Sequence, residues 1–152
     1  MSILQIRTDG DPILRRVAGP ADVRDPQIAR LAIDMLDTLM EHSGMGLAAP
    51  QVGQSVRLII MRTSSGDHQP RAFVNPQIIR TKGEQLSLGE GCLSVPGKFG
   101  RVLRPAVVWM RYQDLADGSY KVEQFKGIMA VCASHEVDHL DGILFIDKSE
   151  AK

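Results

Sequence analysis

The sequence lacks three features that would assign it to a membrane, to the secretory route or to nucleic acid. No apolar run approaches the roughly 20 residues that span a bilayer. The stretch from Met1 to Asp11 has no long apolar segment and carries two acidic residues, so we expect neither a signal peptide nor a transit peptide. Its 18 basic residues balance 18 acidic residues, which gives no reason to expect a nucleic acid or an anionic membrane as a direct partner. We therefore expect a cytoplasmic protein.

Cysteine is also scarce, with only Cys92 and Cys132 in the chain. One disulfide is arithmetically possible, but it would be unusual in the cytoplasm, so metal binding or plain burial is the expected role of each thiol. Hydrophobic residues make up 43% of the 152 residues, which is typical of a soluble globular protein. Because there is no repeat, low-complexity tract or linker, the length predicts one domain over residues 1–152.

Two segments have the pattern of helices. The first runs from Asp25, a candidate N-cap followed by Pro26, to Ser43, with Gly44 as the C-cap. Its apolar residues recur at helical spacing and predict one buried face, formed by Ile28, Leu31, Ala32, Met35, Leu36, Leu39 and Met40. The second helix, from Gly127 to Leu140, is apolar nearly all round, which predicts a helix through the middle of the domain.

Between these helices the pattern changes to short strands. We expect strands at residues 56–61, 72–74, 77–79, 107–111 and 120–125, and a loop at residues 63–70. Pro76 predicts an edge strand or a bulge, and Asp117-Gly118 predicts a hairpin turn. The expected fold class is therefore α+β: mostly antiparallel short strands packed around the second helix, with one further N-terminal helix.

The strongest chemical motif is H-E-x-x-H, formed by His135, Glu136 and His139 in the second helix. Residues four apart share a helix face, so both imidazoles can reach one metal ion. Glu136 is offset enough to contact a metal-activated water without binding the metal. The motif also occurs by chance, and a histidine pair can be a surface feature. Histidines and acids on so apolar a helix would nevertheless be costly without partners.

A catalytic divalent site usually has three protein ligands and one open position. The candidates for the third ligand are Cys92, Cys132, Glu90, His42 and His68. Cys132 lies three residues before His135 on the same helix face, so we expect its short side chain in a wall beside the metal. Cys92 follows a glycine in a tight segment, and the residues alone favour it only modestly.

A glycine-rich segment precedes Gln51. Gly44 to Gln51 contains small residues that permit close backbone approach to a ligand, and the Gln51 amide is a candidate donor to an oxyanion. Taken alone, the segment is more often just a cap and loop. It is not a phosphate-binding loop, because no lysine followed by serine or threonine comes after it.

Together these segments resemble the peptide deformylase family, which carries G-x-G-L-A-A-x-Q, E-G-C-L-S and H-E-x-D-H in this order. The chain has all three intact, at Gly44 to Gln51, Glu90 to Ser94 and His135 to His139. The resemblance extends to Asp11-Pro12-Ile13-Leu14-Arg15, Val74-Asn75-Pro76 and residues 143–147, and so covers essentially the whole chain.

The resemblance implies a metal-dependent hydrolase that removes the N-formyl group from the formylmethionine of newly synthesised proteins and releases formate. It implies that Cys92, His135 and His139 bind one divalent metal, in this family typically Fe(II), with zinc, nickel or cobalt replacing it in handled samples. Glu136 is then the general acid/base, and Gln51 and the backbone amide of Leu93 form the oxyanion hole.

The resemblance also implies where the substrate lies. N-formylmethionyl peptides of nascent chains are the expected partner. The expected substrate-binding residues, from the glycine-rich segment, the Cys92 segment and the methionine pocket, are Gly44, Met45, Gly46, Leu88, Glu90, Gly91, Ile128, Val131 and Cys132. Glu90 and Arg104 match a family ion pair that braces the Cys92 segment.

The chain departs from the family pattern at three places. Ser134 stands where the family commonly has glutamine, which puts a hydrogen bond behind the metal ligands in doubt. Phe99 falls on a common arginine position in the loop that receives the substrate backbone. Only Lys148 to Lys152 follow Asp147, so we do not expect a C-terminal helix that docks on the ribosome.

Three alternative functions stay open on the sequence. The first is a hydrolase that acts on a different N-formyl compound, which Ser134 and Phe99 leave open. The second is a metal-binding protein without activity, although such a protein needs neither Glu136 nor Gln51. The third is an ordinary H-E-x-x-H metalloprotease, which usually takes its third ligand downstream, where no histidine follows His139 and Glu150 is the sole glutamate.

Overall fold

The structure is a computed structural model that describes residues 2–63 and 69–149. Its sheet has five strands, all paired antiparallel in the order β1-β2-β3-β4-β5. The strands are β1 (Gly46–Ala48), β2 (Leu58–Met61), β3 (Arg71–Glu90), β4 (Gly100–Gln113) and β5 (Tyr120–Lys126). The helices are α1 (Pro26–His42), α2 (Ile128–Leu140) and the short 3₁₀ helices η1 (Pro12–Arg15), η2 (Ala49–Val52) and η3 (Phe145–Asp147). This confirms the α+β class.

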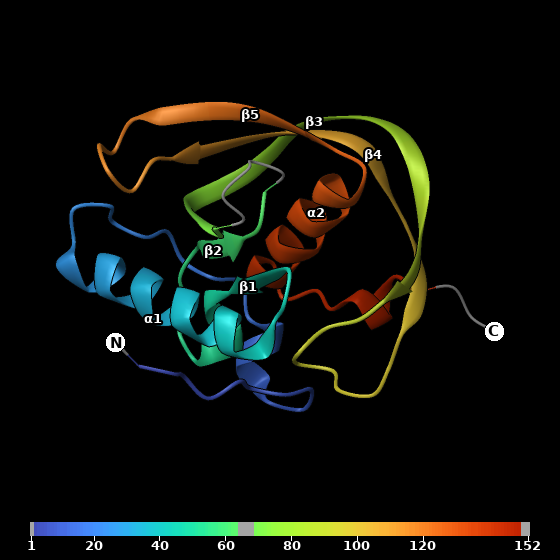
Figure 1. Cartoon of the computed structure of the whole chain (residues 1–152), viewed down its shortest axis with the longest axis horizontal. Coiled ribbons are helices and arrows are strands. Elements are labelled where there is room, and N and C mark those ends of the chain that lie inside the picture. The colour runs from blue at the N-terminus through green and yellow to red at the C-terminus, as the bar shows by residue number, and fades with distance from the viewer. Residues whose placement is uncertain (1, 64–68, 150–152) are drawn as a thin grey trace.

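Helix α2 lies inside the curve of the sheet, beneath β3, β4 and β5 (Figure 1). Its residues Ala130, Ala133 and Leu140 are fully buried. They pack in one cluster with side chains of β2, β3, β4 and β5 that include Ile59, Phe73, Val108, Met110 and Phe125. The prediction that this helix runs through the middle of the fold is therefore confirmed, and it explains why the helix is apolar nearly all round.

Strand β2 separates the two helices. Ile59 and Met61 belong to the cluster around α2, while Leu58 and Ile60 belong to the cluster around α1. All four residues are completely buried. Because both faces of this strand are buried, its sequence does not need to alternate between polar and apolar residues. This explains why the strand is a continuous apolar run.

Helix α1 begins where the sequence predicts, because the Asp25 side chain accepts a hydrogen bond from the backbone N–H of Gln27 and Pro26 occupies the first turn. Its end differs by one residue. Ser43, not Gly44, is the C-cap and adopts a left-handed conformation with φ of 55°. The expected buried face was wrong at Met40, which is 48% exposed.

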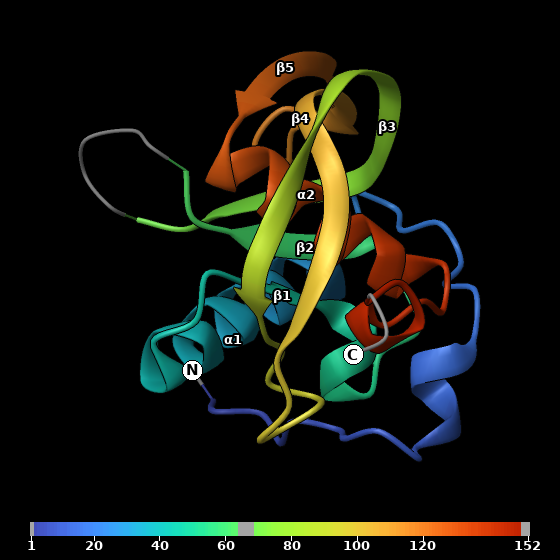
Figure 2. The ribbon, with the colours of Figure 1, turned by 90° about the vertical axis from the view of Figure 1, so that its right-hand side faces the viewer.

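Strands β3 and β4 run side by side along most of their length (Figure 2). At 20 and 14 residues they are longer than the short strands expected, whereas β1, β2 and β5 are short. The register shifts between Val74 and Gln77, around Pro76, so the bulge interpretation is confirmed. The edge-strand alternative was wrong, because β3 lies between β2 and β4. The β4–β5 hairpin turns at the predicted Asp117-Gly118.

Some sequence predictions fall on residues outside the described part of the chain. They are most of the loop at residues 63–70, the candidate ligand His68 and the downstream candidate Glu150. Within the described residues, no helix has both the length and the apolar character needed to cross a membrane.

Candidate metal centre

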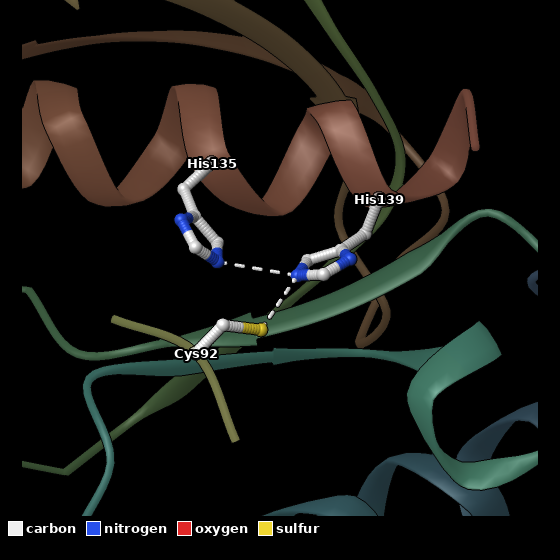
Figure 3. A group of neighbouring side chains, drawn as sticks. All are labelled: Cys92, His135 and His139. Carbon is white, nitrogen blue, oxygen red and sulfur yellow. Dashed lines mark hydrogen bonds between the residues drawn. The ribbon is translucent and has the colours of Figure 1, made fainter. Parts of the chain in front are cut away.

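Three side chains converge at one point between α2 and the segment that joins β3 to β4. The potential ligand atoms of Cys92, His135 and His139 all lie within 4.8 Å of one another. The Nε2 atom of His139 is 3.2 Å from Nε2 of His135 and 3.4 Å from the Cys92 sulfur. Figure 3 shows both imidazoles leaving successive turns of α2 and pointing toward the Cys92 sulfur.

This geometry fits a tetrahedral metal ion. Bonds of about 2.0–2.3 Å to nitrogen and sulfur place tetrahedral ligand atoms about 3.3–3.6 Å apart. The separations of 3.2 and 3.4 Å from His139 Nε2 are close to that range, so the three side chains are arranged as a metal ion would require. Of the other candidates for the third ligand, Cys132, Glu90 and His42 lie outside this group.

Glu90 holds His135 from behind. Its carboxylate lies 2.6 Å from Nδ1 of His135, which leaves Nε2 directed at the metal position. Burial raises the pKa of Glu90, but the hydrogen bonds from His135 and Arg104 outweigh it and lower the pKa to about 2. Glu90 is therefore a carboxylate, and it fixes both the tautomer and the orientation of the first histidine.

Arg104 ties this carboxylate to α2. Its guanidinium reaches Glu90 at 2.5 Å and Asp138 at 2.8 Å, and its side chain is only 2% exposed. The ion pair between Glu90 and Arg104 is thus present, and Asp138 is a second partner that sequence reasoning missed. The aspartate of H-E-x-D-H was the signal for this ion pair in the sequence. Its partner, Arg104, could not be predicted because the contact depends on how β4 folds across α2.

The second histidine lies in an environment that keeps it neutral. Burial lowers the pKa of His139 well below its usual value, and the neighbouring His135 and Arg104 lower it further. A neutral imidazole offers a lone pair to a metal ion. Burial also opposes protonation of His135, but contacts with Cys92 and Glu90 raise its pKa to about 10, so a binding cation displaces a proton there.

Glu136 points into the space beside the three ligand residues. It is 4% exposed, and its Oε1 atom is buried without a hydrogen-bond partner in the described part of the chain. Burial raises its pKa to about 7. A buried carboxylate oxygen without a partner, beside three potential ligand atoms, is suited to accept a proton from a water that a metal ion activates. The donor set and this orphaned atom both fit a catalytic metal.

The Gly46 backbone passes directly over Glu136. A side chain at this glycine would bring its Cβ within 2.7 Å of Glu136 Oε2 and 3.0 Å of the Cys132 sulfur. Glycine is therefore needed here for close approach. The absence of a side chain at Gly46 lets the edge strand β1 lie against the same site. Cys132 lines the site beside the candidate ligands, as its position in the helix predicted.

Gln51 is fixed by two neighbours. Its Oε1 accepts a hydrogen bond from the Ala48 backbone N–H at 2.9 Å, and its Nε2 donates to the Ser94 hydroxyl at 3.0 Å. Nε2 also lies 3.5 Å from the Cys92 sulfur. Sequence reasoning missed the role of Ser94, although it is the last residue of E-G-C-L-S. Gln51 is only 1% exposed, so these neighbours hold its amide inside the site.

A pocket of 590 Å³ opens onto these groups. It is lined by Gln51, Cys92, Leu93, His135 and Glu136. Every residue expected to bind substrate also lines it, namely Gly44, Met45, Gly46, Leu88, Glu90, Gly91, Ile128, Val131 and Cys132. His42 and Phe99 lie at the same pocket. The Ser134 hydroxyl, in contrast, is buried without a hydrogen-bond partner among the described residues, consistent with the expected loss of a bond behind the ligands.

Fold and site together define a metal-binding hydrolase with an apolar pocket. The family model for polypeptide deformylase matches residues 3–152. A peptide deformylase from Rhodopseudomonas palustris (strain BisB5) is 43% identical over 151 residues, which cover 97% of this chain and 86% of that relative. One from Agathobacter rectalis is also 43% identical, over 99% of this chain and 92% of the relative.

Solved structures agree. The crystal structure of peptide deformylase from Thermotoga maritima superposes with a TM-score of 0.92 at 36% identity and covers 99% of this chain and 100% of its own. A Met-Ala-Ser-bound class I type b peptide deformylase from Acinetobacter baumannii gives a TM-score of 0.88 at 35% identity, over 97% and 99% of the two chains. This chain belongs to the polypeptide deformylase family, whose members are metal-dependent enzymes that act on formylated nascent peptides.

Proposed function

We propose that this chain, as one catalytic domain over residues 1–152, hydrolyses the N-formyl group of formylmethionine at the start of newly synthesised proteins in the cytoplasm. The observation that carries the proposal is the placement of Glu136 beside the Cys92, His135 and His139 group, at the end of an apolar pocket. Peptides that begin with formylmethionine are the substrate, and formate and a free N-terminal methionine are the products.

Cys92, His135 and His139 would hold the metal ion, and we propose Fe(II) in the cell. One thiolate and two imidazoles suit a borderline divalent ion, so zinc, nickel and cobalt would also bind in handled samples. When bound, the ion supplies a Lewis acid that activates water and offsets negative charge on the carbonyl oxygen.

The protein's own residues carry the proton and the developing charge. Glu136 takes the proton of the attacking water and then gives it to the departing amine nitrogen. The Gln51 amide, held toward the site by Ala48 and Ser94, donates to the oxygen that becomes negative. The Leu93 backbone amide is the second donor. Because the Gln51 amide is held in place before the reaction, this donor needs no reorganisation as charge forms.

The apolar wall selects the methionine side chain. Ile128, Val131 and Cys132 of α2 and Leu88 of β3 all line the pocket. Burial raises the pKa of the Cys132 thiol well above its usual value, so this side chain stays neutral and acts as a small apolar group. An unbranched thioether fits such a wall, and α2 thus supplies both the pocket and two metal ligands.

Formate release from formyl-Met-Ala-Ser tests this function. The protein is purified without oxygen, loaded with Fe(II), and assayed for formate on formyl-Met-Ala-Ser and formyl-Asp-Ala-Ser and for a newly freed amino terminus on these peptides and acetyl-Met-Ala-Ser. We expect rapid hydrolysis of the first peptide only. Absence of release by folded, metal-loaded protein would overturn the proposal, and equal release from the formyl-Asp peptide would point to a different N-formyl substrate.

A further inference from the structure

The sheet has one side that no helix covers. Helix α2 packs on the inner side of β3, β4 and β5, and no helix of the described chain lies on the opposite side (Figure 1; Figure 2). On β4, Val107, Trp109 and Arg111 point to that side, because they alternate with the buried Val108 and Met110. We call this surface the outer face; its side chains include Arg80, Lys82, Trp109, Arg111, Tyr120 and Lys126.

Positive charge collects on the outer face, although the whole chain has 18 basic and 18 acidic residues. Its four cations, Arg80, Lys82, Arg111 and Lys126, are all exposed, and none of them forms an ion pair with a residue that the structure describes. Glu84 is the sole acid among the described outward residues of these three strands. The balance of the composition therefore hides a surface that attracts anions.

The four cations form a band across the sheet. Lys82 and Lys126 lie in one cross-strand row, Arg80 lies in the next row, and Arg111 lies in the row after that. Since a strand rises about 3.3 Å per residue and every second residue faces outward, neighbouring rows are about 6.7 Å apart. A band with this spacing can contact several phosphates of one extended strand of nucleic acid.

Two of these cations stack on aromatic rings. The Arg80 guanidinium lies 4.6 Å from the ring centroid of Trp109, and the Arg111 guanidinium lies 4.0 Å from that of Tyr120. Stacking holds a planar guanidinium in place and leaves its N–H edge open to a phosphate. Tyr120 is 55% exposed and lines two adjoining hollows of about 680 Å³ each, so a nucleotide base has room beside its ring.

A single strand of RNA matches these features together. Single-strand binding surfaces combine cations that follow the phosphates with aromatic rings on which bases stack. The sheet curves around α2, so the outer face is convex (Figure 1). A flat anionic bilayer would meet only part of a convex face, whereas a flexible strand can follow it. Most single-stranded nucleic acid in a cell is RNA.

We propose that the outer face binds single-stranded RNA, with its four cations on phosphates and a base stacked on Tyr120. None of these residues lines the metal pocket. The RNA site is therefore separate from the candidate metal centre, and the inference does not depend on the proposed function.

Fluorescence anisotropy with a labelled oligouridine of about 12 nucleotides tests the proposal. We expect binding in the micromolar range at low salt. Four phosphate contacts, at about −0.7 each, predict a slope of about −2.8 for the logarithm of the association constant against that of salt concentration. Affinity should then fall about 50-fold between about 50 mM and about 200 mM salt.

Variants assign the binding to the outer face. Arg80→Gln combined with Arg111→Gln should weaken binding at least about tenfold at low salt and reduce the size of the slope by about 1.4. Arg16→Gln combined with Arg30→Gln is the matched control, because it removes the same charge from exposed positions outside the sheet. Tyr120→Ser should weaken binding about fivefold or more, equivalent to about 1 kcal/mol, and leave the slope unchanged.

Circular dichroism checks that each variant is folded. Absence of salt-dependent binding by the folded wild-type protein would overturn the inference, and so would equal losses in the two double variants. Binding to phosphatidylserine vesicles without binding to RNA would also overturn it, because the face would then belong to a membrane surface. Formate release from formyl-Met-Ala-Ser should be unchanged in every variant, so failure of the RNA assay and failure of the proposed function are distinguishable.

Discussion

The two cysteines differ in what surrounds their sulfur atoms. The Cys92 sulfur lies 3.4 Å from Nε2 of His139 and belongs to the potential metal-binding group. The Cys132 sulfur faces Gly46 and Glu136 in a fully buried wall, where burial and the nearby carboxylates disfavour a thiolate. Only a thiolate is a strong metal ligand, so the two positions have different functions although both line one pocket.

Paired serine substitutions separate these functions. Cys92→Ser should weaken metal retention by more than about tenfold, since even groups that only support a ligand contribute that much. Cys132→Ser should keep the metal and change KM for formyl-Met-Ala-Ser. Metal content after dialysis against a chelator measures the first effect. Equal metal loss in both variants would show that the third ligand is wrongly assigned.

At the scale of elements, Arg104 links three parts of the fold. It extends from β4, pairs with Glu90 at the end of β3, and pairs with Asp138 on α2. Asp138 also meets Lys148 at 3.0 Å. Since Glu90 in turn holds His135, the orientation of this candidate metal ligand depends on how β3, β4 and α2 are joined.

Arg104→Met should therefore affect both stability and the metal site. Removing one partner of a buried ion pair leaves uncompensated charge and costs about 3–5 kcal/mol. Loss of support for His135 should also weaken metal affinity about 10–100-fold. Urea unfolding and metal titration measure the two effects.

Arg24→Met is the control, because Arg24 and Asp22 form an ion pair whose side chains are 89% and 60% exposed, and such pairs contribute about 0–1 kcal/mol. Similar losses in both variants would contradict the role of Arg104.

The elements that the sequence predicted are those whose burial follows a simple period. Helix α1 has one buried stripe and clear caps, α2 is buried over most of its surface and β2 is buried on both faces, so their apolar patterns were sufficient. The length of β3 was not predictable in this way. From Arg80 to Glu84 its side chains are exposed, so pairing with β4 is maintained by backbone hydrogen bonds that leave no hydrophobic period in the sequence.

The candidate site, like the fold, was predictable only in part. H-E-x-x-H places two histidines on one helix face by geometry alone, while Cys92 and Gln51 were only weak candidates until the family resemblance favoured them. The supporting contacts of Ser94 with Gln51 and of Asp138 with Arg104 join segments that are distant in the sequence. Which polar side chains meet across such distances is decided by the folded backbone.

At the scale of the whole molecule, the metal group joins segments that are far apart in the chain. Cys92 lies between β3 and β4, and both histidines are on α2. A cation that binds these residues only when they are assembled stabilises the native state by mass action. The free energy of unfolding should therefore depend on the concentration of free metal.

Metal at 100 times its dissociation constant should stabilise the fold by about 2.7 kcal/mol. For a chain of about this length, the midpoint of thermal unfolding should rise by roughly 5–10 °C. Scanning calorimetry with and without Ni(II) measures the shift, and Cys92→Ser should show a smaller one. The same shift in wild type and variant would mean that the metal stabilises the protein from another site.

Glu136→Gln tests most directly whether this arrangement is a hydrolytic site. The amide keeps the shape of the side chain but cannot take the proton of the attacking water, and loss of such a group typically lowers turnover about 10²–10⁴-fold. The measurement is formate release from formyl-Met-Ala-Ser alongside metal content, on wild type and variant loaded in parallel. We predict metal content close to that of wild type and a fall in kcat of about a thousandfold. Full activity in the metal-loaded variant would contradict the account.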